Sequence, residues 1–229
     1  MDALGIRMQG ICKSFETGSS RRFAALNNID AIIDGRSITV FKGPSGSGKT
    51  TMLSLIGAMS RPTSGRIWVG DTEITSLPER FLSDIRCRRF GFVFQNYHLI
   101  RGVSVLENIM VPAYPTQASH RQVRQRARAL LEQLEIGAKA GQRAEYLSGG
   151  EQQRAAIARA LINDPEFVIA DEPTAHLDTA LAGRFLDIVS GLKRAGKTVL
   201  MASHDPLIFE SATVDRVIEL RDGSIVKDP

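Results

Sequence analysis

The chain has 229 residues but only two cysteines, Cys12 and Cys87, which lie far apart in the sequence. Neither belongs to a CxxC pair or to a Cys/His cluster, the spacings that chelate a metal ion. The sequence therefore excludes a cysteine-based metal site. We expect two free thiols, each buried or half-buried.

Long hydrophobic runs are also missing, although hydrophobic residues make up 43% of the chain. Apolar stretches such as 167–170 have the length of a strand, whereas a membrane-spanning helix needs about 20 apolar residues. The first residues lack the apolar core of a secretory signal. We therefore expect a protein that is made and kept in the cytoplasm.

Charge of one sign is not concentrated either, because the formal net charge is +4 at pH 7 and the arginines are scattered. Such a modest excess usually reflects a solvated surface, and we expect no direct contact with nucleic acid. Internal repeats, low-complexity tracts and linkers are absent from the sequence too. We therefore predict one compact domain over residues 1–229.

Short apolar segments alternate with helical ones over much of the chain, which predicts an α/β fold with a mainly parallel central sheet. The segments expected as strands of this sheet are 37–41, 90–94, 167–170 and 198–202. Residues 179–195 have helical apolar spacing, and Gly196 is a plausible C-cap. The first 75 or so residues instead predict an antiparallel β flap, with turns at 17–20 and 34–35.

Residues 103 to about 163 are expected to be almost entirely helical. One helix there has an apolar face of Val123, Leu130, Leu131 and Leu134 and an opposite face of Arg121, Arg124, Arg126 and Arg128. The arginines could contact a partner or phosphates, although a solvated surface is the simpler interpretation. We predict that an α-helical subdomain, roughly 96–163, is inserted in the core.

A glycine-rich octet follows the predicted strand 37–41 and precedes a predicted helix. It matches GxxxxGK[ST] and consists of Gly43, Pro44, Ser45, Gly46, Ser47, Gly48, Lys49 and Thr50, with Thr51 next. Glycines let backbone N–H groups approach phosphates, and the helix N-terminus attracts the same anion. Lys49 is suited to bind the β- and γ-phosphates of a nucleotide, and Thr50 to bind Mg²⁺. A chance glycine-rich turn is the alternative, and the pattern alone specifies no function.

Two carboxylates, Asp171 and Glu172, end the apolar strand predicted at 167–170. At the mouth of the sheet, Asp171 can hold Mg²⁺ with its waters, and Glu172 can act as the general base on the attacking water. Taken alone, the pair could equally carry a helix N-terminal charge or lie on the surface. His204 follows the predicted strand 198–202, which would place it beside the γ-phosphate. An ordinary core or surface histidine is the alternative.

A second glycine-containing segment, 147–154, has the sequence LSGGEQQR and introduces a predicted helix at 154–161. Ser148, Gly149 and Gly150, together with a helix N-terminus, form an anion site that lacks a lysine. One phosphate loop with a lysine and one without it suggest a nucleotide shared between two subunits. A simple N-cap at Ser148 is the alternative.

With these motifs in this order, the chain resembles the ABC (ATP-binding cassette) ATPase family over essentially its whole length. The resemblance implies a P-loop NTPase core with Walker A at 43–50, the signature at 147–154 and Walker B at 167–172. It is similar, within the family, to the group that serves lipoprotein release, macrolide efflux and cell division. Ala175-His176 departs from the Gly-Asn or similar pair usual in that group.

The resemblance also implies roles for single residues. Gln95 would be the Q-loop glutamine, in contact with Mg²⁺ or its water, and Asp178 would belong to the D-loop. His204 would be the switch histidine that contacts the γ-phosphate. Phe15 matches the aromatic residue that stacks on adenine, although it could be an ordinary strand-end residue, and Phe23 is a weaker rival.

The assembly implied by the resemblance is a head-to-tail dimer of two copies that encloses two ATP molecules. Each γ-phosphate would lie between Lys49 of one copy and Ser148 and Gly150 of the other. Hydrolysis would drive a separate integral-membrane permease, so the chain would be peripheral on the cytoplasmic face of the inner membrane.

Two other functions fit parts of the pattern. A non-transport ABC ATPase acting on DNA or ribosomes usually carries a coiled-coil insert, zinc-binding cysteines or a second cassette, and this sequence has none of these. A nucleotide-dependent structural module without turnover is disfavoured by the presence of Glu172 and His204.

Overall fold

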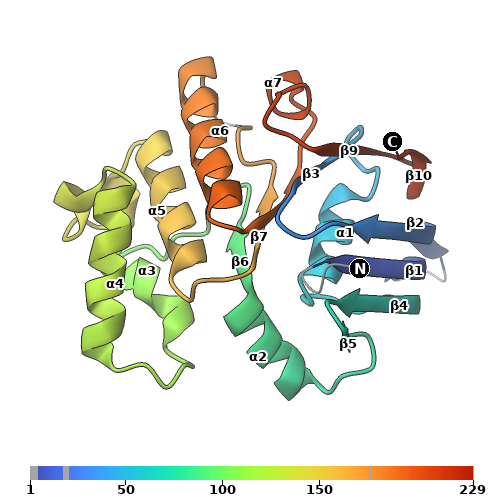
Figure 1. Cartoon of the computed structure of the whole chain (residues 1–229), viewed down its shortest axis with the longest axis horizontal. Helices are drawn as coiled ribbons and strands as arrows, with labels where there is room; N and C mark the ends of the chain where they lie inside the picture. The colour runs from blue at the N-terminus through green and yellow to red at the C-terminus, as the bar shows by residue number, and fades with distance from the viewer. Residues whose placement is uncertain (1–4, 18–20, 176, 229) are drawn as a thin grey trace.

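The computed structural model describes residues 5–17, 21–175 and 177–228. The N-terminal part of the chain forms most of an antiparallel sheet. Its strand order is β2-β1-β4-β5 (Figure 1). These strands are β1 (Ile6–Thr17), β2 (Arg21–Ile33), β4 (Ser64–Val69) and β5 (Thr72–Glu73). The predicted antiparallel flap is confirmed. Its turn at 17–20 lies mostly outside the described residues, whereas 34–35 turns the chain from β2 into the second sheet.

A six-stranded sheet has the order β10-β9-β3-β8-β7-β6. Its strands are β3 (Ile38–Lys42), β6 (Phe90–Val93), β7 (Phe167–Asp171), β8 (Thr198–Ala202), β9 (Arg216–Arg221) and β10 (Ser224–Lys227). Five of them run parallel, and only β10 pairs antiparallel, with β9. The four segments predicted for this sheet all form strands, to within a residue at their ends, so the mainly parallel sheet is confirmed.

The parallel sheet is buried on both faces. In β7, Phe167 and Ile169 pack into the core that also contains α1 and the antiparallel sheet, whereas Val168 and Ala170 pack against the helices on the other face. Side chains alternate between faces along a strand, so a strand covered on both sides must be apolar throughout. Figure 1 shows α1 (Lys49–Ile56) beside the antiparallel strands, with α5 (Gly149–Leu161) and α6 (Thr179–Arg194) across the sheet from it.

The remaining helices lie between the strands in sequence. They are α2 (Glu79–Arg89), α3 (Val105–Met110), α4 (His120–Gln133), α5 (Gly149–Leu161), α6 (Thr179–Arg194) and α7 (Pro206–Phe209), with short 3₁₀ turns η1 (Val111–Ala113), η2 (Gly137–Lys139) and η3 (Ala144–Tyr146). The segment between β6 and β7 is therefore mainly helical, although turns and extended residues separate its helices, so 103–163 is less completely helical than predicted. Gly196 follows the C-cap Ala195 rather than being the C-cap, and its φ of +80° gives the left-handed turn that ends α6.

The surface helix α4 has the amphipathic character expected from its sequence. Val123, Leu131 and Leu134 are buried, and the four arginines are exposed.

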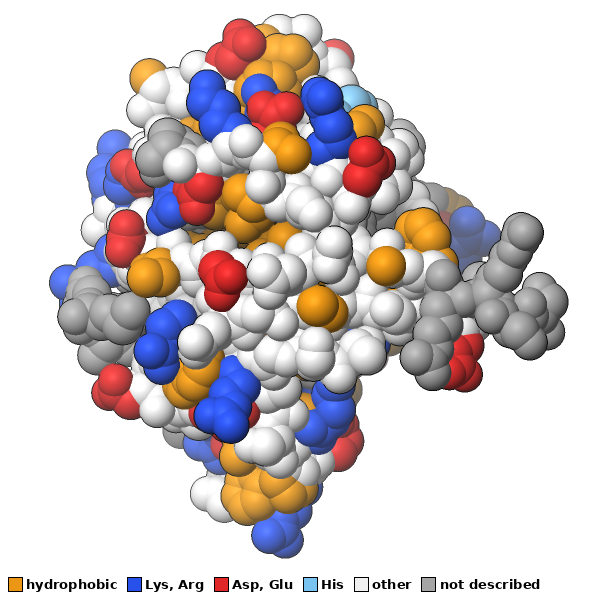
Figure 2. Space-filling model, turned by 90° about the vertical axis from the view of Figure 1, so that its right-hand side faces the viewer, with side chains coloured by type: hydrophobic (Ala, Val, Ile, Leu, Met, Phe, Trp, Pro, Cys, Tyr) orange, Lys and Arg blue, Asp and Glu red, His pale blue; other side chains and the backbone are white. Residues whose placement is uncertain are grey.

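Figure 2 shows basic and acidic side chains interspersed on another face, the right-hand side of Figure 1. No helix in the described part of the chain is long and apolar enough to cross a membrane. Both cysteines are free and half-buried, as expected.

Candidate functional site

The glycine-rich octet forms the turn between β3 and α1, as predicted. Gly48, the N-cap of α1, has a φ of +101°, and a Cβ atom there would lie 2.7 Å from the carbonyl oxygen of Ala25. Gly43 has a φ of +156°, and a Cβ there would lie 2.2 Å from the carbonyl oxygen of Leu220. Both positions therefore require glycine for steric reasons.

The loop borders an open cavity of about 440 Å³. The residues that line it are Phe23, Ala25, Pro44, Ser45, Gly46, Ser47, Gly48, Lys49, Thr50, Thr51, Gln95, Glu172 and His204. The structure thus brings together most of the predicted phosphate-site residues, from five separate parts of the sequence. Gly43 and Asp171 are outside this lining but contact Lys49 and Thr50, respectively.

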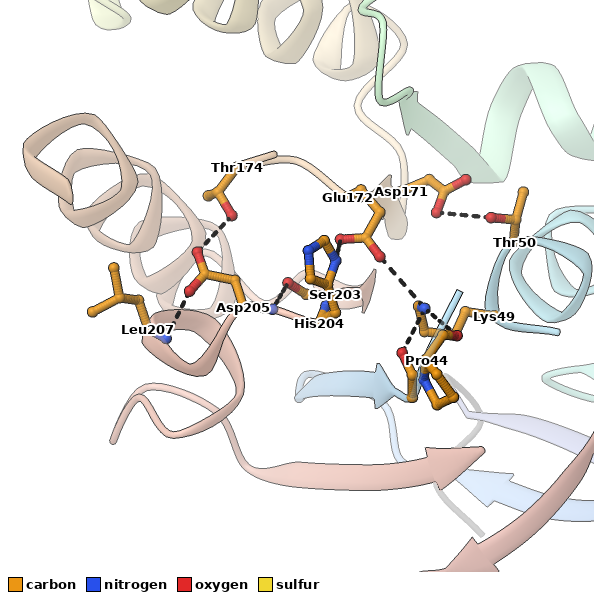
Figure 3. A network of polar contacts seen from close by, with 11 residues as sticks. Pro44, Lys49, Thr50, Asp171, Glu172, Thr174, Ser203, His204, Asp205 and Leu207 are labelled. Carbon is orange, nitrogen blue, oxygen red and sulfur yellow. Dashed lines mark hydrogen bonds and ion pairs between the residues drawn. The ribbon is translucent and has the colours of Figure 1, made fainter. Parts of the chain in front are cut away.

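Lys49 supplies a buried positive charge at this cavity, with only 7% of the residue exposed. Its Nζ donates hydrogen bonds to the carbonyl oxygens of Gly43, at 2.8 Å, and Pro44, at 3.2 Å, and lies 3.5 Å from Glu172 Oε1 (Figure 3). Ser47 Oγ is also buried and has no hydrogen-bond partner among the described residues. A buried ammonium and a free hydroxyl beside a loop of backbone N–H groups suit a phosphate ligand.

Asp171 and Thr50 form the second polar pair of the site. Thr50 Oγ1 donates to Asp171 Oδ1 at 3.1 Å. Burial raises the pKa of the Asp171 carboxyl, and the Thr50 hydrogen bond opposes that shift. The described residues contain no cluster of three or more His, Cys, Asp or Glu side chains that could hold a metal alone. One carboxylate and one hydroxyl fit Mg²⁺, which usually takes its other ligands from water and substrate phosphates.

Gln95 also lines the cavity, two residues beyond the end of β6. The chain beyond it is held by Arg159 of α5, whose guanidinium donates to the carbonyl oxygens of Tyr97 and His98. Tyr97 and His98 both have positive φ values, 56° and 46°. The arginine therefore supports an unusual backbone turn next to Gln95, a contact that the sequence did not predict.

Glu172 occupies the centre of the polar network shown in Figure 3. Its Oε2 lies 2.9 Å from Nδ1 of His204, and its Oε1 faces Lys49. The neighbouring strands β7 and β8 bring these residues together, because Asp171 pairs with Ala202 in the parallel register. The Glu172 side chain is 14% exposed and the His204 side chain 66% exposed. The carboxylate therefore lies at the cavity wall, with water able to reach it from the cavity.

The signature residues lie elsewhere, at the start of α5. Ser148 is the N-cap, and its capping box with Glu151 makes the helix begin at Gly149, five residues earlier than the sequence suggested. Ser148 and Gly149 are exposed, and Gly150 is buried. Asp178, the N-cap of α6, accepts a hydrogen bond from Leu181 N–H at 2.9 Å. None of these residues lines the cavity formed by the described residues around Lys49.

The aromatic side chain at the cavity comes from β2 rather than β1. Phe23 lines the cavity, and Phe15 pairs opposite Phe23 in the antiparallel register without lining it. Both rings are exposed. Stacking of adenine on Phe15 stays a prediction, and the cavity lining favours Phe23. Ala25 was missed because an alanine carries no chemical signal; packing of β2 against Gly48 brings it to the loop.

These features define a P-loop nucleoside triphosphatase: a glycine-rich loop around a buried lysine, with a hydroxyl–carboxylate pair and a further carboxylate at the end of parallel strands. The family model described as "ABC transporter" matches residues 26–175, more than half of the chain. The chain belongs to this family and is an ABC-type ATPase cassette.

The relatives agree with this placement. The chain is 40% identical to a macrolide export ATP-binding/permease protein MacB of Rhodopseudomonas palustris, over 97% of this chain but 34% of that protein. It thus spans about a third of the length of such relatives. It is 37% identical to the uncharacterized ABC transporter ATP-binding protein YvrO of Bacillus subtilis, over 97% and 96% of the two chains. The dimeric ABC transporter cassette MJ0796 superposes with a TM-score of 0.90 at 34% identity, over 98% and 97%.

Proposed function

We propose that two copies of this chain form a head-to-tail dimer that binds and hydrolyses two ATP molecules. The observation that carries the proposal is the separation of the two anion sites within one chain. The cavity around Lys49 is open, and the helix N-terminus at Ser148 and Gly150 is not part of it. A second copy can supply its Ser148 segment to close the cavity. The dimeric form of the related cassette supports this arrangement.

The proposed roles follow from the contacts. Lys49 and the loop N–H groups bind the phosphates, and Glu172 accepts the proton of the attacking water. His204 holds the Glu172 carboxylate and faces the terminal phosphate, while Phe23 or Phe15 contacts adenine. Thr50, Asp171 and Gln95 are the residues that would hold Mg²⁺. The ion, when bound, neutralises phosphate charge.

We further propose that the chain serves a separate integral-membrane permease and works at the cytoplasmic face of the membrane. The relatives named as combined ATP-binding/permease proteins support this partner, since they join a matching cassette to a permease in one chain. The whole of 1–229 would form one ATPase domain. Within this domain, the helical subdomain at roughly 96–163 would move together with the permease, and the segment after Gln95 would connect that movement to the ATP site.

Affinity purification from detergent-solubilised membranes tests the proposed partner. With the chain tagged and expressed at its native level, we expect an integral-membrane protein with few transmembrane helices to co-purify. Recovery of soluble proteins or nucleic acid alone would contradict the permease and favour a non-transport ATPase. A matched preparation of a tagged Glu172→Gln variant with ATP should retain the same membrane protein.

Ser148→Arg tests the shared site. The larger, charged side chain at the α5 N-cap should prevent the second copy from closing on ATP, while the Lys49 cavity of each chain stays intact. We expect ATP binding by the monomer to be unchanged and phosphate release to fall by about 100-fold or more, as when a transition-state hydrogen-bond donor is removed. A fully active Ser148→Arg protein would refute the shared site. Ser119→Arg, at the α4 N-cap, is the matched control for loss of a capping serine.

A further inference from the structure

Glu172 has a backbone conformation that it would not adopt without support. Its φ of +46° is in the left-handed region, and the following residue is Pro173. Residues before proline prefer extended conformations, and a non-glycine residue in the left-handed region is strained. The Glu172 N–H donates to the Ala202 carbonyl at 2.9 Å, and its carbonyl accepts from Ala175 N–H at 3.2 Å. The direction of the carboxylate therefore depends on contacts that hold this turn.

The two residues after Glu172 are anchored to two further elements. Thr174 Oγ1 donates to Asp205 Oδ2 at 3.1 Å, next to the start of α7 (Figure 3). The carbonyl oxygen of Pro173 accepts a hydrogen bond from Gln153 Nε2 at 2.8 Å. Both ends of this second bond are buried, and Gln153 is 3% exposed. Gln153 is the anchor that comes from α5.

Gln153 thereby links two parts of the proposed reaction site. It is the fifth residue of α5, whose N-terminus carries Ser148 and Gly150. At the other end of the link, Pro173 is bonded directly to Glu172 in the chain. A rigid helix connects the two ends, so a displacement of the α5 N-terminus would be passed to the Glu172 turn through one buried hydrogen bond. If its donor is removed, a buried carbonyl oxygen is left without a partner, which is costly.

We propose that Gln153 is a positioning residue: its hydrogen bond to Pro173 fixes the turn that aims the Glu172 carboxylate and ties that turn to the signature helix. This inference rests on the proposed function, in which Glu172 is the general base. Gln153 itself does not line the ATP cavity. It acts through the backbone of residues 172–174. When a second copy closes on Ser148, the contact would therefore affect the position of Glu172 in the chain that carries that Ser148.

The first test is hydrogen exchange of the nucleotide-free protein, which does not depend on turnover. Gln153→Met keeps the side-chain length but removes the donor. We expect the Glu172 and Ala175 amides to exchange about tenfold faster, the size of effect that corresponds to one net hydrogen bond. Thr198→Val is the matched control, because it removes the part-buried hydrogen bond that the buried Thr198 hydroxyl accepts from Arg36 N–H at the opposite end of β8. Unchanged exchange at both amides in folded Gln153→Met would overturn the proposal.

The second test separates positioning from a purely structural role. Gln153→Met should lower kcat about tenfold with an unchanged KM for ATP, whereas Thr198→Val should leave both unchanged. A Gln153→Met protein with faster exchange but normal kcat would refute positioning of the base. Gln153→Asn keeps the amide but shortens the side chain; it should give the same result and replaces the methionine variant if that does not fold. If the wild-type protein releases no phosphate, the proposed function fails, and the exchange test still decides whether Gln153 holds the turn.

Discussion

Glu172→Gln should retain ATP, lose turnover and accumulate as an ATP-bound dimer. Glutamine has the shape of glutamate but cannot accept the proton of the attacking water, and removal of a general base typically lowers kcat by about 10²- to 10⁴-fold. Binding should not weaken, because the Glu172 carboxylate lies 3.5 Å from Lys49 Nζ and competes with phosphate for that ammonium. A neutral amide leaves Lys49 more available, so we expect ATP affinity to stay equal or increase.

Phosphate release, equilibrium ATP binding and light-scattering mass measure the three parts of this expectation. Glu219→Gln is the matched control, since Glu219 pairs with Lys42 at 3.4 Å and does not line the cavity. It should turn over ATP at the wild-type rate and dissociate after hydrolysis. Normal turnover by Glu172→Gln would exclude Glu172 as the general base, whatever its effect on dimer mass.

Much of this site could be predicted from sequence because the topology of parallel sheets places strand ends together. Lys49, Asp171 and His204 follow three separate apolar segments, and those segments pair as β3, β7 and β8. Side chains at the carboxyl ends of parallel strands must then meet at one edge. The octet that contains Lys49 has three glycines with positive φ values, a local requirement that the sequence pattern reveals, whereas the close contacts of Gly43 with Leu220 and of Gly48 with Ala25 depend on the fold.

Other features had no local signal. Phe23 lines the cavity because its strand β2 packs against the glycine-rich loop at Gly48, and nothing in its sequence neighbours distinguishes it from Phe15. The left-handed φ of Glu172 contradicts the preference of a residue before proline, so a sequence rule predicts the wrong conformation. Gln153 looks like any polar residue of a helix until the fold buries it against Pro173. All three features result from contacts between distant segments, which place Phe23 at the cavity, hold Glu172 in a strained conformation and bury Gln153 against Pro173.

Lys49→Ala should abolish ATP binding at concentrations that saturate the wild-type protein. The ammonium is buried, and its present partners are two carbonyl oxygens and the Glu172 carboxylate, all of which a phosphate oxygen can replace. Hydrogen bonds to charged groups contribute about 1.5–3 kcal/mol each, so losing one or more of them corresponds to at least about 10- to 100-fold weaker binding. Removing the lysine also leaves the carboxylate of Glu172 beside incoming phosphate charge, which adds repulsion.

Titration with a fluorescent ATP analogue, followed by competition with ATP, measures this loss. Lys42→Ala is the control: Lys42 ends β3, just before the loop, yet its Nζ pairs with Glu219 and lies 5.0 Å from the ring centre of Phe209. It should bind ATP like the wild type. Because Glu172 contributes to the repulsion, Lys49→Ala combined with Glu172→Gln should recover part of the affinity. Unchanged affinity in Lys49→Ala would remove Lys49 from the phosphate site, and no recovery in the double variant would show that the carboxylate contributes nothing to the loss.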